Sequence, residues 1–137
     1  MVSEKGYILI KRVWKPGDVI EYEMPMPVRR VIAHENVEDD IGRVALERGP
    51  LVYCIEQADN DVENLNNINI NDTAELQSEF KPNLLNGISI ITGKVNYLEH
   101  SNNDESIKKI EHNMVAIPYH LWTNRERGEM AVWILRE

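Results

Sequence analysis

The chain has 137 residues and a mass of 15.9 kDa, which is the size of one ordinary domain. Hydrophobic residues make up 42% of it and charged residues 28%, so we expect a buried core rather than a disordered chain. A net charge of −8 argues against partners that are recognised through phosphate groups, both nucleic acid and an anionic membrane surface. No apolar run approaches the roughly 18–20 residues of a membrane-spanning helix.

The first 24 residues contain two segments that are typical of strands. Tyr7–Trp14 is rich in β-branched and aromatic residues, and apolar residues alternate with polar ones over Ile20–Met24. Between them, Lys15–Asp18 places proline and glycine where a type II turn requires them. We therefore expect a hairpin over residues 7–24. Prolines then interrupt strand pairing in Met24–Pro27, where we expect a boundary.

The rest of the chain reads as short strands separated by turn signals. Leu65–Ile70 has the pattern of an edge strand, Ala74–Phe80 fits a strand or a helical turn, and Gly93 is expected to break its strand. A polar tip at Ser101–Ser106 is expected to join two strands of a hairpin. The pattern predicts an all-β chain, an antiparallel β-sandwich of jelly-roll type with eight to ten strands. Its further strands are Val28–His34, Arg43–Arg48, Leu51–Glu56, Ile88–Tyr97, Lys108–Ile117 and Met130–Leu135.

Metal-ligating residues are present but poorly arranged. A zinc-like site needs three or four convergent ligands, and the spacing of the histidines does not predict one. The segment Asp59–Asn64 begins like a calcium loop, but its sixth position is Asn64 instead of glycine and its twelfth is Ile70 instead of glutamate. We predict no metal site, and a looser calcium site formed by this loop with Asp72 is the alternative. The four histidines are His34, His100, His112 and His120.

No residue pattern predicts a catalytic centre. Glu21 and Glu23 are paired carboxylates of the type that glycosidases use, but their alternation with apolar neighbours predicts that they face solvent. The single cysteine, Cys54, lies in an apolar strand and is expected to be a small buried side chain. A cysteine nucleophile would need an activating partner, and the sequence shows none. We therefore predict no catalytic residue in this chain.

The aromatic residues are the best candidates for ligand contact. Trp14 and Trp133 lie in expected strands and are predicted to be core residues. Tyr119, Trp122 and Arg125 lie in an irregular segment after a proline, and sugar-binding proteins stack rings on such side chains. These three residues are our predicted substrate-binding residues, with a corner of the core as the alternative for the two aromatic side chains.

Several strings of residues occur in the order found in a known family. The sequence closely resembles the C-terminal region of glycoside hydrolase family 127, the β-L-arabinofuranosidase-like enzymes once known only as a domain of unknown function. The resemblance covers nearly the whole chain and is weakest over 59–78 and 100–108. It is carried by Gly6-Tyr7, Arg12-Val13-Trp14, Pro16-Gly17-Asp18, Met24–Val31, Gly42–Leu46, Arg48–Cys54, Ala116–Tyr119, Trp122–Arg125 and Gly128–Trp133.

The resemblance implies that the chain is a piece of a longer enzyme. Family members have an (α/α)6 barrel catalytic domain followed by β-sandwich domains. The resemblance implies that residues 1–24 are a strand pair from the end of the preceding sandwich and that 25–137 form the C-terminal sandwich. The family's zinc ion, held by three cysteines and a glutamate, belongs to the barrel. Since Cys54 is the only cysteine, no catalytic or zinc-binding position can be transferred to this chain, and we expect no cofactor in it.

The function implied by the resemblance is that of a non-catalytic domain in a bacterial glycoside hydrolase. Its expected partners are the catalytic barrel and a second copy in a homodimer. The alternative is a carbohydrate-binding module for arabinose-containing, plant-type glycans, and a free-standing interaction module is a third hypothesis. Family members occur in the bacterial cytoplasm and in the periplasm, so the compartment is left open.

Overall fold

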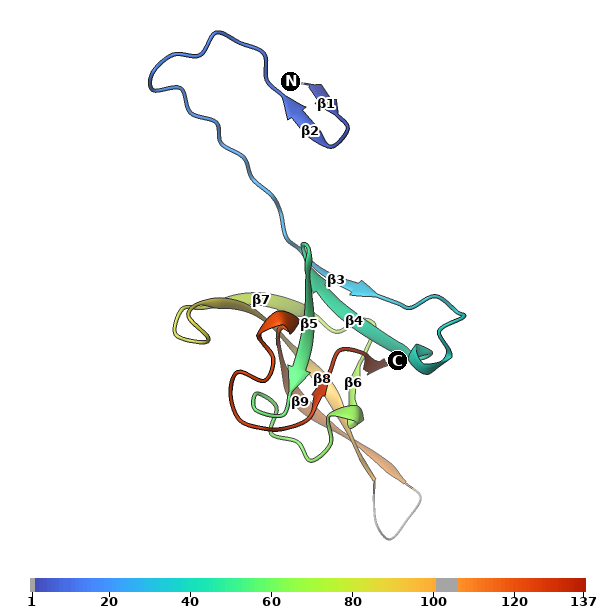
Figure 1. Ribbon diagram of the computed structural model, residues 1–137. Helices are drawn as coiled ribbons and strands as arrows, with labels where there is room; N and C mark the ends of the chain where they lie inside the picture. The colour runs from blue at the N-terminus through green and yellow to red at the C-terminus, as the bar shows by residue number, and fades with distance from the viewer. Residues whose placement is uncertain (1, 101–105) are drawn as a thin grey trace.

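The computed structural model describes residues 2–100 and 106–137, and these form an all-β structure (Figure 1). The described residues include no α-helix, and none of their helical segments could cross a membrane. The only helical segments among them are three single 3-10 turns: η1 at Glu38–Asp40, η2 at Leu65–Asn67 and η3 at Tyr119–Leu121. The all-β class expected from the sequence is confirmed.

Eleven strands are present in the described residues, nine of them in one large sheet. Two short strands, β1 (Val2–Glu4) and β2 (Tyr7–Leu9), pair only with each other. The large sheet contains β3 (Val28–Val31), β4 (Arg43–Arg48), β5 (Leu51–Glu56), β6 (Ile68–Ile70), β7 (Leu76–Lys81), β8 (Ile88–His100), β9 (Ile107–Pro118), β10 (Met130–Ala131) and β11 (Ile134–Arg136).

The strand pairings of the large sheet return to their starting point. β4 pairs with β5, β5 with β9, β9 with β8, β8 with β6, β6 with β11, and β11 with β4. All of these pairs are antiparallel except β6 with β11. β3, β7 and β10 add to this circuit as outer strands. The mostly antiparallel arrangement agrees with the sequence, and the jelly-roll topology stays a prediction.

The core has two parts, and β5 contributes to both. Tyr53 and Ile55 belong to the larger cluster, whereas Cys54 between them belongs to a smaller cluster on the opposite face of the strand. This division follows from the strand geometry, because successive side chains point to opposite faces. β9 is divided in the same way, with Met114 in the larger cluster and Ile117 in the smaller one. Where β5 and β9 pair, at Tyr53–Ile55 and Ala116–Pro118, both strands are therefore buried on both faces.

Two strands have the bounds that the sequence indicates. β4 and β5 begin and end where the sequence predicts, because Gly49 and Pro50 interrupt the pairing between them. β8 differs, since it continues through Gly93 without a break. Glycine is needed there for close packing and not for a turn, since a methyl group on Gly93 would lie 2.6 Å from Cδ2 of Leu76 in the neighbouring strand.

Three expectations from the middle and end of the chain are corrected or lie outside the structure. β6 is fully buried between β8 and β11, so Leu65–Ile70 does not contain an edge strand. The predicted final strand is two strands, because the chain crosses from β5 to β4 at Val132 and Trp133. Ala74–Phe80 proves to be a strand, β7. The predicted tip, Ser101–Ser106, lies outside the described residues except for Ser106.

The predicted hairpin over residues 7–24 is wrong. β2 pairs with β1, and no strand forms over Ile20–Met24. The turn itself is present, since the Asp18 amide donates to the Lys15 carbonyl at 3.1 Å and Gly17 has φ +90°. Trp14 is about half exposed, at 49%, and is not a core residue. In Figure 1 this N-terminal segment lies apart from the large sheet, at the end of an extended connection.

Candidate functional site

The predicted binding residues lie in the loop between β9 and β10. Pro118 is the last residue of β9, and its fixed φ of −56° leads directly into η3. The chain then leaves η3 at Trp122 in an extended conformation, and Thr123 adopts the left-handed region with φ +59°. The loop returns at Met130, which pairs with Glu56 at the end of β5. We refer to residues 119–129 as the aromatic loop.

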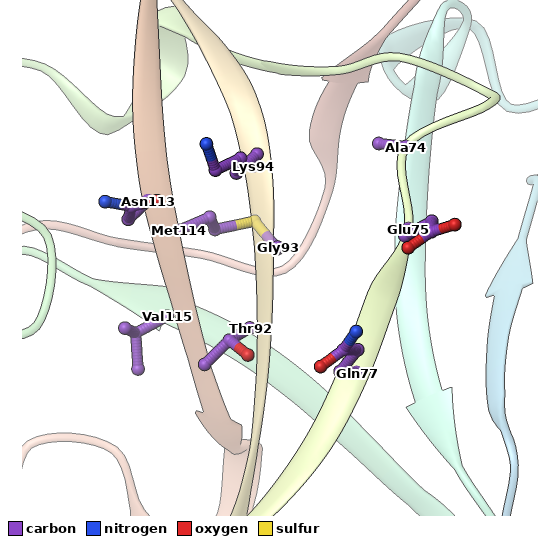
Figure 2. Close-up of a pocket in the computed structure, with 9 residues that line it drawn as sticks. All are labelled: Ala74, Glu75, Gln77, Thr92, Gly93, Lys94, Asn113, Met114 and Val115. Carbon is purple, nitrogen blue, oxygen red and sulfur yellow. The ribbon is translucent and has the colours of Figure 1, made fainter.

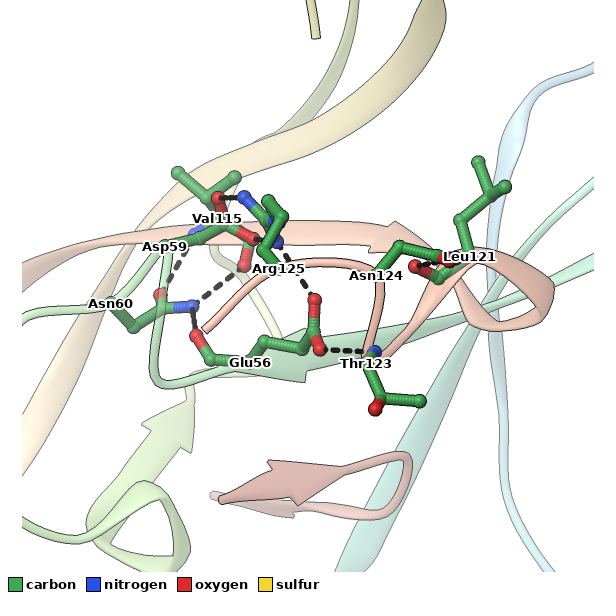
Figure 3. Close-up of polar contacts among 8 residues, drawn as sticks. All are labelled: Glu56, Asp59, Asn60, Val115, Leu121, Thr123, Asn124 and Arg125. Carbon is green, nitrogen blue, oxygen red and sulfur yellow. Dashed lines mark hydrogen bonds and ion pairs between the residues drawn. The ribbon is translucent and has the colours of Figure 1, made fainter. Parts of the chain in front are cut away.

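An ion cluster holds the aromatic loop against the end of β5 (Figure 3). The Arg125 guanidinium donates to the Glu56 carboxylate at 2.7 Å and pairs with Asp59 through both terminal nitrogens. Glu56 and Asp59 are only 6% and 10% exposed in their side chains, and Arg125 is 21% exposed. Hydrogen bonding to Asp59, supported by Glu56 and opposed by burial, raises the pKa of Arg125 above its usual range.

Four further hydrogen bonds complete this cluster. The second oxygen of Glu56 accepts a hydrogen bond from the Thr123 amide at 2.8 Å, which ties the strained residue of the loop to β5. Asn60 is fully buried, and its side-chain amide donates to the carbonyls of Glu56 and Val115, both at 2.9 Å. The Asn60 carbonyl oxygen accepts from the Val115 amide at 2.9 Å. These hydrogen bonds tie the loop to the ends of β5 and β9, although Nε of Arg125 is buried without a hydrogen-bond partner among the described residues.

Tyr119 and Trp122 lie on the outside of this fixed loop. Their rings are stacked, with centroids 6.4 Å apart and planes 22° from parallel, and both are exposed. His120 between them is also exposed. The structure therefore brings the three predicted binding residues into one loop but gives them different surroundings. The aromatic rings face solvent, whereas the Arg125 charge is already paired with two carboxylates.

Cys54 lies on β5 beside this cluster and is fully buried, as the sequence predicts. Burial, together with the nearby carboxylates of Glu56 and Asp59, raises the pKa of its thiol to about 12, and the positive charge of Arg125 opposes this rise. The thiol therefore stays protonated at neutral pH. Because the thiolate is the reactive and metal-binding form, this position does not favour nucleophilic or zinc chemistry.

Within residues 2–100 and 106–137, no group of three or more potential ligands is arranged to hold a metal ion. His112 instead contacts Asn60, with Nε2 3.3 Å from its carbonyl oxygen. A carbonyl oxygen can only accept a hydrogen bond, so His112 must act as the donor through Nε2. Burial lowers the pKa of His112, and nearby Asp61 opposes this effect. Asp72, which would complete the looser calcium site, forms an ion pair with Arg136.

A separate hollow lies on the face of β7, β8 and β9 (Figure 2). Its volume is about 540 Å³, and its walls include the side chains of Gln77, Thr92 and Asn113. The amine of Lys94 at its edge pairs with Glu111 at 2.9 Å. No aromatic residue lines the hollow, so it lacks the flat surface on which a sugar ring stacks. The aromatic loop is the better candidate for contact with a sugar.

The model for the glycoside hydrolase family 127 C-terminal domain matches residues 28–135, which is most of the large sheet. This chain belongs to glycoside hydrolase family 127. A non-reducing end β-L-arabinofuranosidase from Bifidobacterium longum subsp. longum is 33% identical over 143 residues, which cover 95% of this chain and 21% of that protein.

Solved structures of family 127 proteins share the fold. A β-L-arabinofuranosidase from Geobacillus stearothermophilus T6 matches with a TM-score of 0.78 and 42% identity, over 82% of this chain and 19% of that one. A second family 127 β-arabinofuranosidase matches with a TM-score of 0.76 and 38% identity, over 82% of this chain and 17% of that one. The chain thus spans about a fifth of the length of these relatives.

The ion cluster of this family 127 domain was not foreseen from the sequence. Glu56 and Asp59 lie 69 and 66 residues before Arg125, so no local pattern connects them. One signal was available, because Glu56 ends an apolar strand in which a charged side chain needs a partner when it is buried. The identity of that partner depends on how β9 and β10 pair with β5, which is a tertiary property.

Proposed function

We propose that this chain is a non-catalytic domain of a β-L-arabinofuranosidase-like glycoside hydrolase and that it stabilises a catalytic domain in the longer enzyme. The observation that carries the proposal is the exposed apolar surface of the N-terminal segment, residues 5–24, which we call the arm. Its exposed large hydrophobic residues are Tyr7, Ile8, Leu9, Val13, Trp14, Val19, Ile20, Tyr22 and Met24.

The arm has the properties of a segment that packs against something else. Its turn brings residues 6–10 near residues 20–22, and together they line an open hollow of about 350 Å³ with a largely apolar wall. Soluble domains seldom leave apolar patches of this kind uncovered unless they bind another surface. The arm has no strand pairing with the large sheet. A preceding domain of the longer enzyme is therefore the cover that we propose, with the arm belonging to that domain.

The state of Cys54 supports a non-catalytic role. A thiol with a pKa of about 12 is protonated at neutral pH and is inaccessible in the folded chain. We propose that the catalytic residues and the zinc ion of the enzyme belong to the catalytic domain. Metal analysis of the 137-residue chain should then find no stoichiometric zinc, and one tightly bound zinc per chain would contradict this part of the proposal.

Substitution in the arm tests the supporting role. Ile20→Ser and Tyr22→Ser should each destabilise the longer enzyme by about 1.5–3 kcal/mol, the value of burying one large apolar side chain. The same changes in the isolated chain, measured at a concentration where it is monomeric, should have almost no effect, because these side chains are already exposed in the monomer. Val37→Ser is a matched control, since Val37 is an exposed apolar residue outside the arm, in the loop between β3 and η1. Equal effects on the unfolding midpoints of the two proteins would refute the proposal.

The stacked pair of Tyr119 and Trp122 favours a second candidate function, binding of arabinose-containing glycans. An exposed aromatic pair on a rigid loop can stack against sugar rings without any positive charge. Titration of the chain with arabinan fragments should quench tryptophan fluorescence, and Trp122→Ala should abolish the signal. Trp14→Ala is the control, because Trp14 is exposed but lies in the arm. No signal at millimolar ligand would dismiss this candidate.

In isolation the arm could also be covered by a second copy of the chain. We propose that the isolated chain then forms a homodimer through residues 7–24, because uncovered apolar segments associate. Sedimentation at increasing concentration should show a dimer, and a shortened chain that begins at Met24 should remain monomeric. A full chain that stays monomeric at every concentration would contradict the proposed homodimer.

A further inference from the structure

The β4–β5 hairpin, the β7–β8 turn and η3 enclose a second apolar hollow of about 430 Å³. We call it the Arg48 pocket; its walls include Arg48, Tyr53, Phe80, Leu85, His120 and Leu121. We propose that this pocket binds a segment of the longer enzyme that presents a carboxylate side chain beside an apolar one. The inference rests on the proposed function, which supplies the longer enzyme, and adds the surface and the chemistry of the contact.

Arg48 is the charged group of this pocket, and its guanidinium interacts there with the side chain of Tyr53. Its Nε is buried without a hydrogen-bond partner, and its Nη1 lies 3.9 Å from the sulfur of Met26. Among the described residues no carboxylate lies within ion-pair distance of it, whereas Arg29 and Arg136 each have one. A half-buried guanidinium has lost part of its hydration, so a carboxylate that can accept two hydrogen bonds is its best partner.

Phe80 supplies an apolar wall of the pocket and is 63% exposed. The ring lies against Gly87, where an added methyl group would be 3.2 Å from Cζ of Phe80. The turn that carries Gly87 holds Leu85 and Asn86 in the left-handed region, with φ of +47° and +65°. Backbone strain of this kind persists where packing enforces it, and here it directs Leu85 into the pocket. A pre-positioned, uncovered aromatic ring is typical of an interface anchor.

The position of the pocket favours an occupant from the same polypeptide. Met26 packs over the β4–β5 turn, since a methyl group on Gly49 would lie 2.7 Å from its Cε, and Met26 also contacts Arg48. Figure 1 shows the β4–β5 turn, which carries Arg48, at the point where the arm joins the large sheet. The Bifidobacterium relative matches 95% of this chain, so the match includes part of the arm, and most of that relative lies outside the match. A domain that covers the arm would be adjacent to the Arg48 pocket.

Hydroxyl-radical footprinting read by mass spectrometry tests this inference on the isolated chain, at a concentration where it is monomeric, and on the longer enzyme. Oxidation of Phe80 should be lower in the longer enzyme by roughly threefold or more, because side chains at an interface centre lose nearly all their exposure. Ile107, exposed at the distant end of β9, should be oxidised equally in both proteins. Arg48→Gln should restore oxidation of Phe80 in the longer enzyme, whereas Arg29→Gln should not.

Oxidation of Tyr22 in the arm, measured in the same experiment, distinguishes failure of this inference from failure of the proposed function. Protection of both Phe80 and Tyr22 in the longer enzyme supports the docking inference and the supporting role. Protection of Tyr22 alone overturns the Arg48 pocket as a docking site and leaves the supporting role intact. Unchanged oxidation at both positions overturns both. If arabinan fragments protect Phe80 in the isolated chain, the pocket is a sugar site and the docking inference fails.

Discussion

The ion cluster around Arg125 makes the sharpest stability prediction for this domain. Arg125→Met keeps much of the apolar stem but removes the charge, so Glu56 and Asp59 are left as nearly buried carboxylates without a cation. Breaking a buried pair in this way costs about 3–5 kcal/mol. Because Arg125 keeps 21% exposure and water can reach the vacated site, we expect a loss of about 3 kcal/mol, at the lower end of that range.

Equilibrium unfolding in urea, followed by circular dichroism, measures this loss. Arg29→Met is the matched control, because the Arg29–Glu47 pair is exposed, at 58% and 27%, and such pairs contribute about 0–1 kcal/mol. Since the pKa of Arg125 is raised in the folded state, its contribution should be fully present throughout the neutral range and disappear only in strong alkali. A loss for Arg125→Met no larger than that of the control would refute the view that the cluster holds the aromatic loop.

Three further predictions concern buried polar and titratable groups. Asn60→Ala should cost about 2–3 kcal/mol in urea unfolding, because it leaves buried backbone groups of Glu56 and Val115 unpaired, and a loss below that of Arg29→Met would contradict this. Cys54 should alkylate slowly in the native chain and quickly in denaturant. Since its folded pKa is raised to about 12, stability should fall between pH 9 and 12, and Cys54→Ala should reduce that slope. The pKa of His112 is lowered, so stability should fall as pH drops below about 6.5, and His112→Gln should flatten this dependence.

Sequence patterns predicted the strands whose ends are marked by local breakers. Gly49 and Pro50 delimit β4 and β5, and Pro118 ends β9, so these bounds followed from residues in the chain itself. The alternation over Ile20–Met24 was equally clear but did not produce a strand, because a strand forms only when its backbone finds a partner. No local pattern reveals whether that partner exists.

The candidate site was predicted only in part, because local sequence patterns do not reveal its long-range partners. The aromatic residues after Pro118 were evident as a group, and the structure shows them in one loop. The pairing of Arg125 with Glu56 and Asp59 depends on β10 returning to β5, which is a long-range contact. The split between β10 and β11 was missed because Val132 and Trp133 continue the apolar pattern while the chain changes neighbours.

The hydrolysis of an aryl β-L-arabinofuranoside tests the central proposal most directly. The assay compares the purified 137-residue chain with the longer enzyme at equal molar concentration, with added zinc and without it. We predict turnover by the longer enzyme and no hydrolysis above the uncatalysed rate by the isolated chain, with or without zinc. Turnover by the isolated chain at a rate comparable to that of the longer enzyme would contradict the proposal that this family 127 domain is non-catalytic.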